Sequence, residues 1–231
     1  IRAECFVIDV IVDVFQKFLN GFGINMAVGG VALLVIAVWA LILAFLRSLK
    51  GRWFAPLRLF SIVYIDLLRG LPSLLLVLLF GFGMPALNIP GLPKSNIFWG
   101  ALAMISTYSA YAAEVYRSGM DSVHDGQWAA AKALGLNQGQ TLRYAILPQA
   151  VRNVIPSLLN LAVALQKDVA LLSVLGVRDA LREAQIYTAR TFNYSPLIAA
   201  AILFLLAAIP MARLTDWVTE RDRKRRLQRT E

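Results

Sequence analysis

A long run without a charged residue, at residues 24–46, constrains the fold of this chain more than any other feature. It holds about 23 residues, and a helix needs about 20 mostly apolar residues to cross the hydrocarbon core of a bilayer. Backbone donors and acceptors inside lipid must be satisfied within the chain itself, so this run predicts a transmembrane helix. Composition agrees, because 58% of the 231 residues are hydrophobic and the mean hydropathy is +0.63. We therefore expect an all-α integral membrane protein.

Four further apolar stretches predict additional spans, at about residues 56–83, 97–113, 154–177 and 196–211. The loop after the first run carries four cations without an acidic partner, and the basic sequence RDRKRRLQR stands near the end of the chain. The positive-inside rule assigns both segments to the cytoplasmic side. The sequence therefore predicts a polytopic protein with five transmembrane helices, its N-terminus outside and its C-terminus in the cytoplasm.

Two short segments flank the transmembrane domain, which we assign to residues 21–221. In residues 1–20, Asp9, Asp13 and Lys17 recur at every fourth position among apolar residues. This spacing predicts an amphipathic helix that lies in the membrane interface. Residues 222–231 are expected to form a basic cytoplasmic tail.

Composition disfavours several other classes of protein. The net charge of +9 suggests nucleic acid binding, but the cations lie in short loops beside apolar runs, where membrane topology explains them. The single cysteine, Cys5, excludes an intrachain disulfide, and the single histidine, His124, argues against a metal site within this chain. The sequence also lacks a phosphate-binding loop of the form GxxxxGK followed by Ser or Thr. We expect no enzyme activity and no cofactor in this chain, and any nucleotide energy must come from a partner.

The segment at residues 125–150 predicts a polar helical hairpin between two spans. Asp125 is expected to cap a first helix over residues 127–134, and Gly135 is expected to end that helix in the left-handed conformation. A helix of about eight residues is too short to be stable alone in water, where roughly 12 to 15 are needed. Either another subunit grips this helix or it packs on its own chain, and both interpretations remain open at this point.

The second half of the hairpin has its own signals. Asn137 is expected to cap a second helix. Pro148 should break or kink that helix, because it lacks the amide hydrogen and its ring clashes with the preceding turn.

Several motifs along the chain follow one known pattern. The hairpin holds three alanines at positions 129–131, then Gly135, then Leu147 and Pro148, at the spacing of an EAA loop. Four further motifs stand at residues 64–72 (YIDLLRGLP), 108–119 (YSAYAAEVYRSG), 165–177 (LQKDVALLSVLGV) and 189–192 (ARTF). Together they resemble the permease subunits of ABC importers, in the branch that takes up polar amino acids. The resemblance covers residues from about 21 to 221.

Three positions depart from the pattern of that family. Ala129 stands where the EAA triplet has glutamate, and Leu71 and Val169 stand where threonine is usual. The glycine and the proline that shape the loop are retained. The resemblance therefore implies a coupling loop that acts through its shape more than through a charged contact.

The resemblance implies an ABC type I importer architecture in the bacterial inner membrane. Its implied partners are an ABC ATPase that binds ATP and Mg, a second permease, identical or homologous, that completes a dimer, an external substrate-binding protein, and the lipid bilayer. The residues implied in coupling to the ATPase are Gln127, Ala129, Ala130, Ala131, Gly135 and Leu136.

Ionisable side chains inside the predicted spans are costly, so each is a candidate functional group. Arg69 and the pair Lys167 and Asp168 fall at similar predicted depths in their spans. A free amino acid has a carboxylate that Arg69 or Lys167 could bind and an ammonium that Asp168 could bind. Gln166 offers both a donor and an acceptor. We predict these four residues as substrate ligands.

Three further charged residues are expected to form a gate or structural ion pairs. Asp66 lies three residues before Arg69, and Glu114 lies three residues before Arg117, so each pair shares one helix face.

The predicted function is that of a permease subunit that moves a polar amino acid across the membrane by alternating access, driven by a separate ATPase. The main alternative is an ion-coupled carrier or a passive channel for amino acids, in which the same charges line the path. A membrane enzyme is less favoured, because no nucleophile, base and orienting acid converge in the sequence. A structural adaptor is the remaining alternative. The sequence does not name the amino acid or distinguish a homodimer from a heterodimer.

Overall fold

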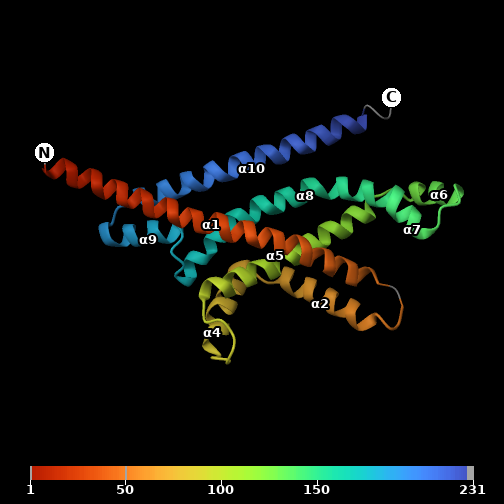
Figure 1. Ribbon diagram of the computed structural model, residues 1–231, viewed down its shortest axis with the longest axis horizontal. Coiled ribbons are helices and arrows are strands. Elements are labelled where there is room, and N and C mark those ends of the chain that lie inside the picture. The colour runs from red at the N-terminus through yellow and green to blue at the C-terminus, as the bar shows by residue number, and fades with distance from the viewer. Residues whose placement is uncertain (1, 50, 228–231) are drawn as a thin grey trace. The chain divides into compact units, whose positions relative to one another are not determined.

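Helices make up the regular secondary structure of the chain in the part that the structure describes. The computed structural model describes residues 2–49 and 51–227, with side chains described for residues 15–49, 51–221 and 224. Every regular element in this part is a helix, so the all-α prediction is confirmed. The elements, shown in Figure 1, are α1 (Arg2–Ser48), α2 (Ala55–Gly70), α3 (Ser73–Leu78), η1 (Leu79–Gly83), α4 (Met84–Ala86), α5 (Asn96–Asp121), α6 (Asp125–Ala133), α7 (Gln138–Gln140), η2 (Thr141–Ile146), α8 (Leu147–Asp168), η3 (Val169–Leu175), α9 (Ala180–Thr191) and α10 (Ser195–Leu227).

By length and composition, three helical segments in the described part can cross a membrane, and four if one bent pair counts as a span. The three are Phe15–Ser48, Gln138–Leu175 and Ser195–Arg221, and the pair is Ala55–Gly70 with Ser73–Ala86. The predicted span at residues 97–113 lies inside α5, which is not among them. The middle of α5 carries the polar run STYS, and its Thr107 and Ser109 are buried. A helix that other helices shield from lipid need not be apolar all round.

The two flanking segments continue the helices next to them. Residues 2–20 form the first turns of α1, without a break before the apolar run. The side chains of Asp9 and Asp13 lie outside the described residues, so the interfacial position of this segment stays a prediction. At the other end α10 runs to Leu227, well into the predicted basic tail.

The chain divides into two compact units. Unit 1 comprises Ile1–Leu34, Leu71–Ile105 and Ala164–Ile209, and unit 2 comprises Val35–Gly70, Ser106–Val163 and Pro210–Glu231. We describe each unit by itself.

In unit 1 a buried polar pair joins α1 to the start of α9. The Asn25 amide Nδ2 donates to Asp179 Oδ2 over 3.1 Å, and Asn25 Oδ1 accepts from the Ala180 amide nitrogen at 3.4 Å. Asp179 Oδ1 accepts from the Arg182 amide at 2.7 Å and so caps α9. Burial raises the pKa of the Asp179 carboxyl above its ordinary value, while these hydrogen bonds act in the opposite direction. Within the described residues, hydrogen bonds from amide donors reach this buried carboxyl group, and no ion pair joins it to a cation.

Glycines let other elements of unit 1 approach closely. A Cβ on Gly81 or on Gly100 would come within 3 Å of the Leu175 side chain. Gly81 lies in η1, Gly100 in α5 and Leu175 at the end of η3. Leu172 of η3 also comes within 3 Å of a Cβ on Gly100, so leucines of η3 fill the space that the two glycines leave. Leu175 is itself 4% exposed and forms part of the core.

Wide helical turns accommodate two of the prolines. The π-helical turn η1 directly precedes Pro85, and the π-helical turn η2 directly precedes Pro148. A π turn shifts the hydrogen-bond register by one residue and so removes the demand for the amide hydrogen that proline lacks. Of the predicted break or kink at Pro148, the break does not occur, because η2 runs into α8 and the chain stays helical from Gln138 to Leu175. The kink stays a prediction.

The contact between α1 and α9 yields a prediction from two neighbouring glycines. A Cβ on Gly21 would lie 2.6 Å from the Asp179 carbonyl carbon and from the Ala180 nitrogen, which are backbone atoms that cannot turn aside. We expect Gly21→Ala to lower the free energy of unfolding by about 1 to 3 kcal/mol, as overpacking does. Thermal unfolding of the purified protein in detergent measures the change.

Gly23 supplies the control, two residues further along α1. Nothing lies within 4 Å of a Cβ on Gly23, and alanine is the better helix former by about 1 kcal/mol. Gly23→Ala should therefore leave stability unchanged or raise it. Equal losses in both variants would mean that the α1–α9 contact is not tight.

Candidate functional site

The short helix α6 of unit 2, green in Figure 1, begins with a histidine cap. The His124 ring nitrogen Nδ1 accepts a hydrogen bond from the Gly126 amide at 3.0 Å, so His124 is the N-cap. The prediction that Asp125 caps the helix is wrong by one residue. Asp125 instead occupies the first turn, where its negative charge faces the positive end of the helix dipole.

The end of α6 follows the predicted glycine turn. Gly135 has a φ of +77°, in the left-handed region. Its amide donates to the Lys132 carbonyl at 2.9 Å, and the Leu136 amide donates to the Ala131 carbonyl at 3.1 Å. These two bonds form a Schellman motif. The prediction for Gly135 is confirmed.

The next turn begins at Asn137, as predicted. Asn137 Oδ1 accepts from the Gln140 amide at 2.9 Å, and Gln140 Oε1 accepts from the Asn137 amide at 3.0 Å. This reciprocal pair is a capping box, with asparagine in place of the usual serine or threonine. Fixed ends on both sides give the hairpin a defined shape despite its short helices.

One face of α6 packs on its own chain and the other face is open. Val123, Ile146 and Ala150 form a small buried core, with Trp128 packed against it. Ala131 is 4% exposed and points into the hairpin, so it is unavailable to a partner. The predicted coupling residues Gln127, Ala129, Ala130 and Gly135 are exposed, and Leu136 is half-buried.

Leu134 extends the open face of α6. Its side chain is 80% exposed, on a helix whose own core is already filled. The sequence-based interpretation did not single it out, although an apolar residue directly before a helix-ending glycine was a usable signal. Together with Ala129 and Ala130 it makes the open face small and apolar.

A cluster of charged side chains gathers around Glu114 of α5, also in unit 2. The predicted pair is confirmed, because Arg117 Nη2 lies 2.9 Å from Glu114 Oε2. Arg117 also binds Asp121 at 2.9 Å. Arg47 of α1 donates to Glu114 Oε1. This contact between residues far apart in sequence gave no signal in the sequence.

Arg69 approaches the same carboxylate but does not bond to it. Its Nη1 atom lies 3.8 Å from Glu114 Oε1, beyond hydrogen-bond distance, and its guanidinium lies 5.9 Å from the centre of the Tyr111 ring. Within the described residues no ion pair joins Arg69 to Asp66, although the two share a helix face. Asp66 itself is exposed.

The other three predicted ligands lie in unit 1, at the end of α8. Gln166 is 7% exposed, and its Nε2 atom has no hydrogen-bond partner among the described residues. Lys167 is exposed, and Asp168 is half-buried and engaged in a contact of its own. Of the three, Gln166 is the one with an unused donor in a buried position.

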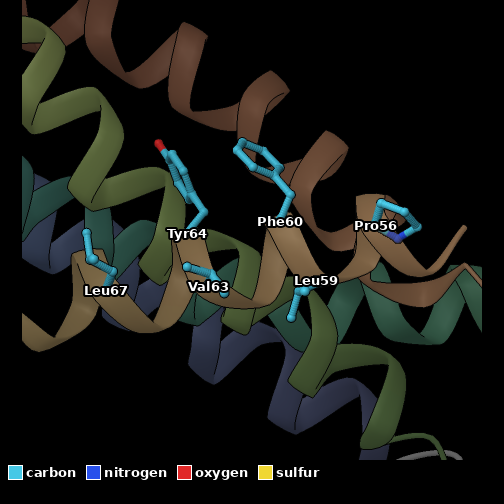
Figure 2. A pocket seen from close by; sticks show the side chains of 6 residues that line it. All are labelled: Pro56, Leu59, Phe60, Val63, Tyr64 and Leu67. Atoms are coloured by element: carbon cyan, nitrogen blue, oxygen red, sulfur yellow. The ribbon is translucent and has the colours of Figure 1, made fainter.

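An apolar hollow of about 410 Å³ follows one face of α2, and Figure 2 shows its side chains. It is lined by Pro56, Leu59, Phe60, Val63, Tyr64 and Leu67. The Tyr64 hydroxyl is already used, since it accepts from Trp39 Nε1 and donates to the Ser106 carbonyl, each over 3.2 Å. The hollow therefore suits a lipid chain or an apolar side chain, and not a charged small molecule.

Comparisons with known proteins agree with one another. Residues 48–224 match the family described as "Binding-protein-dependent transport system inner membrane component". The chain is 37% identical over 181 residues to the putative glutamine transport system permease protein GlnP of Rickettsia conorii, covering 78% of this chain and 81% of that protein. It is 33% identical over 194 residues to the arginine transport system permease protein ArtQ of Bacillus subtilis, covering 83% and 85%.

Solved structures resemble the fold along nearly the whole chain. A chain from the crystal structure of an amino acid ABC transporter with histidines superposes with a TM-score of 0.81 at 29% identity, covering 92% of this chain and 97% of that one. A chain of the MetNI methionine ABC transporter superposes with a TM-score of 0.72 at 14% identity, which shows likeness of fold alone.

The Schellman turn of the hairpin can be tested with two glycines. No atom lies within 4 Å of a Cβ on Gly135, so Gly135→Ala introduces only the cost of a left-handed L-residue, about 1 to 2 kcal/mol. We expect faster amide hydrogen exchange over residues 125–136 in this variant. Gly139 lies in the helical turn α7, where its φ is not positive, so Gly139→Ala should leave exchange unchanged. Equal exchange in both variants would contradict the assignment of Gly135 as the strained position.

Proposed function

The chain belongs to the family of binding-protein-dependent transport system inner membrane components, and on that premise we propose that it takes up polar amino acids such as glutamine or arginine. It is a permease component of an ABC importer, located in the inner membrane. The observation that carries the substrate class is its likeness, over about four fifths of the chain, to permeases named for glutamine and for arginine.

The partners follow from the type of system. Dependence on a binding protein calls for an external protein that delivers the substrate, and the chain has no phosphate loop of its own, so a separate ATPase binds ATP and Mg. A second permease, identical or homologous, completes the path. No cofactor is assigned to this chain.

The proposed topology has five spans. They are α1, the bent pair of α2 and α3, α5, the α8–η3 segment, and α10, with the N-terminus outside and the C-terminus in the cytoplasm. Support comes from the three or four candidate spans and from the cations at residues 47–58 and 222–226. The polar and largely buried helix α5 is the span that composition alone does not detect.

Coupling is proposed to run through the open face of α6. The Schellman turn and the capping box fix the turn between the two halves of the hairpin, and the small apolar face leaves room for close approach by a cleft of the ATPase. This favours docking over a loop helix that only packs on its own chain. Gln127, Ala129, Ala130, Gly135 and Leu136 are the proposed contacts, joined by Leu134, while Ala131 supports the helix from inside.

Substrate binding is proposed for Arg69, Gln166, Lys167 and Asp168. The guanidinium of Arg69 binds the carboxylate of the amino acid, and the negative charge of Asp168 binds its ammonium group. The unused donor of Gln166 forms a hydrogen bond that orients the substrate. Each of these groups is described within its own unit. Glu114 and Arg117 act as an ion pair near the end of the proposed third span.

ATP-dependent uptake tests the proposal against an ion-coupled carrier or a channel. Vesicles that contain the permease, its ATPase and the binding protein should accumulate labelled L-glutamine or L-arginine only when ATP is supplied on the ATPase side. An ionophore that dissipates the proton gradient should leave this uptake intact. Accumulation without ATP hydrolysis would overturn the proposal, and a screen of all twenty amino acids with the same vesicles defines the substrate class.

Gln166 offers a test that separates binding from folding. Removing a buried polar group that has no partner does not destabilise the fold, so Gln166→Leu should keep or raise the melting temperature of the purified complex. Its uptake should fall about tenfold, because a hydrogen bond to the substrate is lost. The control is Thr188→Val in α9, which also removes a buried polar atom without a hydrogen-bond partner, the hydroxyl oxygen Oγ1. Normal uptake by Gln166→Leu would exclude Gln166 as a ligand.

A further inference from the structure

Around Glu114, three guanidinium groups compete for one carboxylate. Arg47 donates to Oε1, while Arg117 donates to Oε2 through Nε at 3.2 Å and Nη2 at 2.9 Å. Both oxygens of Glu114 are thus engaged. Arg69, third in order of distance, lies 3.8 Å from Oε1 and is held there only by longer-range attraction.

Charge balance leaves the cluster positive. Arg47, Arg69 and Arg117 face two carboxylates, Glu114 and Asp121, and the ion pair of Asp121 within the described residues is with Arg117. The carboxylate nearest to Arg69 is therefore largely neutralised by the other two arginines. An excess positive charge remains at Arg69, where an anion would be attracted.

Arg69 also keeps its hydrogen-bonding capacity. Within the described residues it donates no hydrogen bond, and its side chain is 41% exposed, against 25% for Arg47. The Tyr111 ring lies 5.9 Å from its guanidinium and limits its movement on that side. A guanidinium with a free planar fork matches a carboxylate in bidentate geometry.

We propose that Arg47 and Arg117 are positioning residues, which occupy both oxygens of Glu114 so that Arg69 stays free to bind the carboxylate of the transported amino acid. This inference rests on the proposed function. If Arg47 is lost, Glu114 Oε1 turns to the nearby Arg69 and takes the place of the substrate carboxylate. If the charge of Glu114 is lost, nothing in the cluster competes for Arg69.

The proposal predicts that Arg47→Gln weakens substrate binding and that Glu114→Gln does not, whereas a purely structural ion network predicts a loss in both variants. Arg47→Gln should weaken substrate binding about tenfold, the effect of losing one charge-assisted contact. Arg47→Lys keeps a cation beside Glu114 and should restore affinity. Glu114→Gln should bind as tightly as the natural chain or more tightly, and Arg47→Gln added to Glu114→Gln should have no further effect.

The measurement is the Kd of labelled L-glutamine and L-arginine for the purified complex of permease and ATPase, without the binding protein. The same series is run with L-glutaminamide and L-argininamide, which lack the carboxylate. Arg47→Gln should leave the affinity for the amides unchanged. Asp121→Asn is the matched control. The ion pair that it removes, between Arg117 and Asp121, has the same length of 2.9 Å as the pair between Arg117 and Glu114, and it involves neither Arg47 nor Arg69.

Three results would overturn the inference. The first is equal loss of binding in Arg47→Gln and Glu114→Gln. The second is an equal effect of Arg47→Gln on the amino acids and on their amides. The third is no binding of either amino acid by a natural complex that takes both up. If the Arg47→Gln complex does not assemble, the affinity of Glu114→Gln still tests the inference. Weaker substrate binding by Glu114→Gln than by the natural chain would then overturn it. Failure of the importer proposal would appear separately, as absence of ATP-dependent uptake by the natural complex.

Discussion

The need to satisfy polar groups away from water governs this structure. In a bilayer an unpaired backbone amide or carbonyl costs several kcal/mol, and a helix satisfies all of them internally except at its ends. The long helices meet this need directly. At Pro85 and Pro148 a π turn precedes the proline and the chain stays helical, while Pro156 and Pro210 lie inside the α-helices α8 and α10. Where helices end, at His124, Asn137 and Asp179, side chains accept the free amides.

The same constraint explains how charged and polar side chains are arranged. Asp179 is fully buried, and amide donors from Asn25 and from the backbone surround it. Glu114 is enclosed by guanidinium groups on three helices. In both cases the carboxylate ties together elements that lie far apart in sequence. These contacts hold each unit together more specifically than apolar packing does, because each donor must meet its acceptor at a fixed distance.

Local signals were sufficient for some features and insufficient for others. Gly135 and Asn137 were predictable, because a left-handed turn and a capping box depend on residues within one or two turns of each other. No break occurs at Pro148, because the preceding turn widens into a π turn, which the sequence does not show. The cap was assigned to Asp125, since histidine is not among the usual capping residues. The middle of α5 is polar and its Thr107 and Ser109 are buried, and hydropathy along one helix does not show such burial.

Contacts between distant residues lay beyond prediction from a single sequence. Arg47 with Glu114 and Asn25 with Asp179 are separated by 67 and 154 positions, and no spacing rule connects them. Sequence reasoning did single out Arg69 and Gln166, through the cost of polar groups in a span. It did not show that both keep unused donors. Their roles as ligands stay predictions.

Unused donors in both units suit a permease better than a static scaffold. A buried amide without a partner costs about 1 to 3 kcal/mol, and Gln166 carries this cost although a leucine would avoid it. In the proposed importer, the substrate satisfies the donor while it is bound and leaves it unsatisfied on release. Because that cost is already included in the free energy of folding, the donor is desolvated before the substrate arrives and its hydrogen bond adds to substrate binding. Release then requires that the donor and the substrate separate when the path opens to the other side of the membrane.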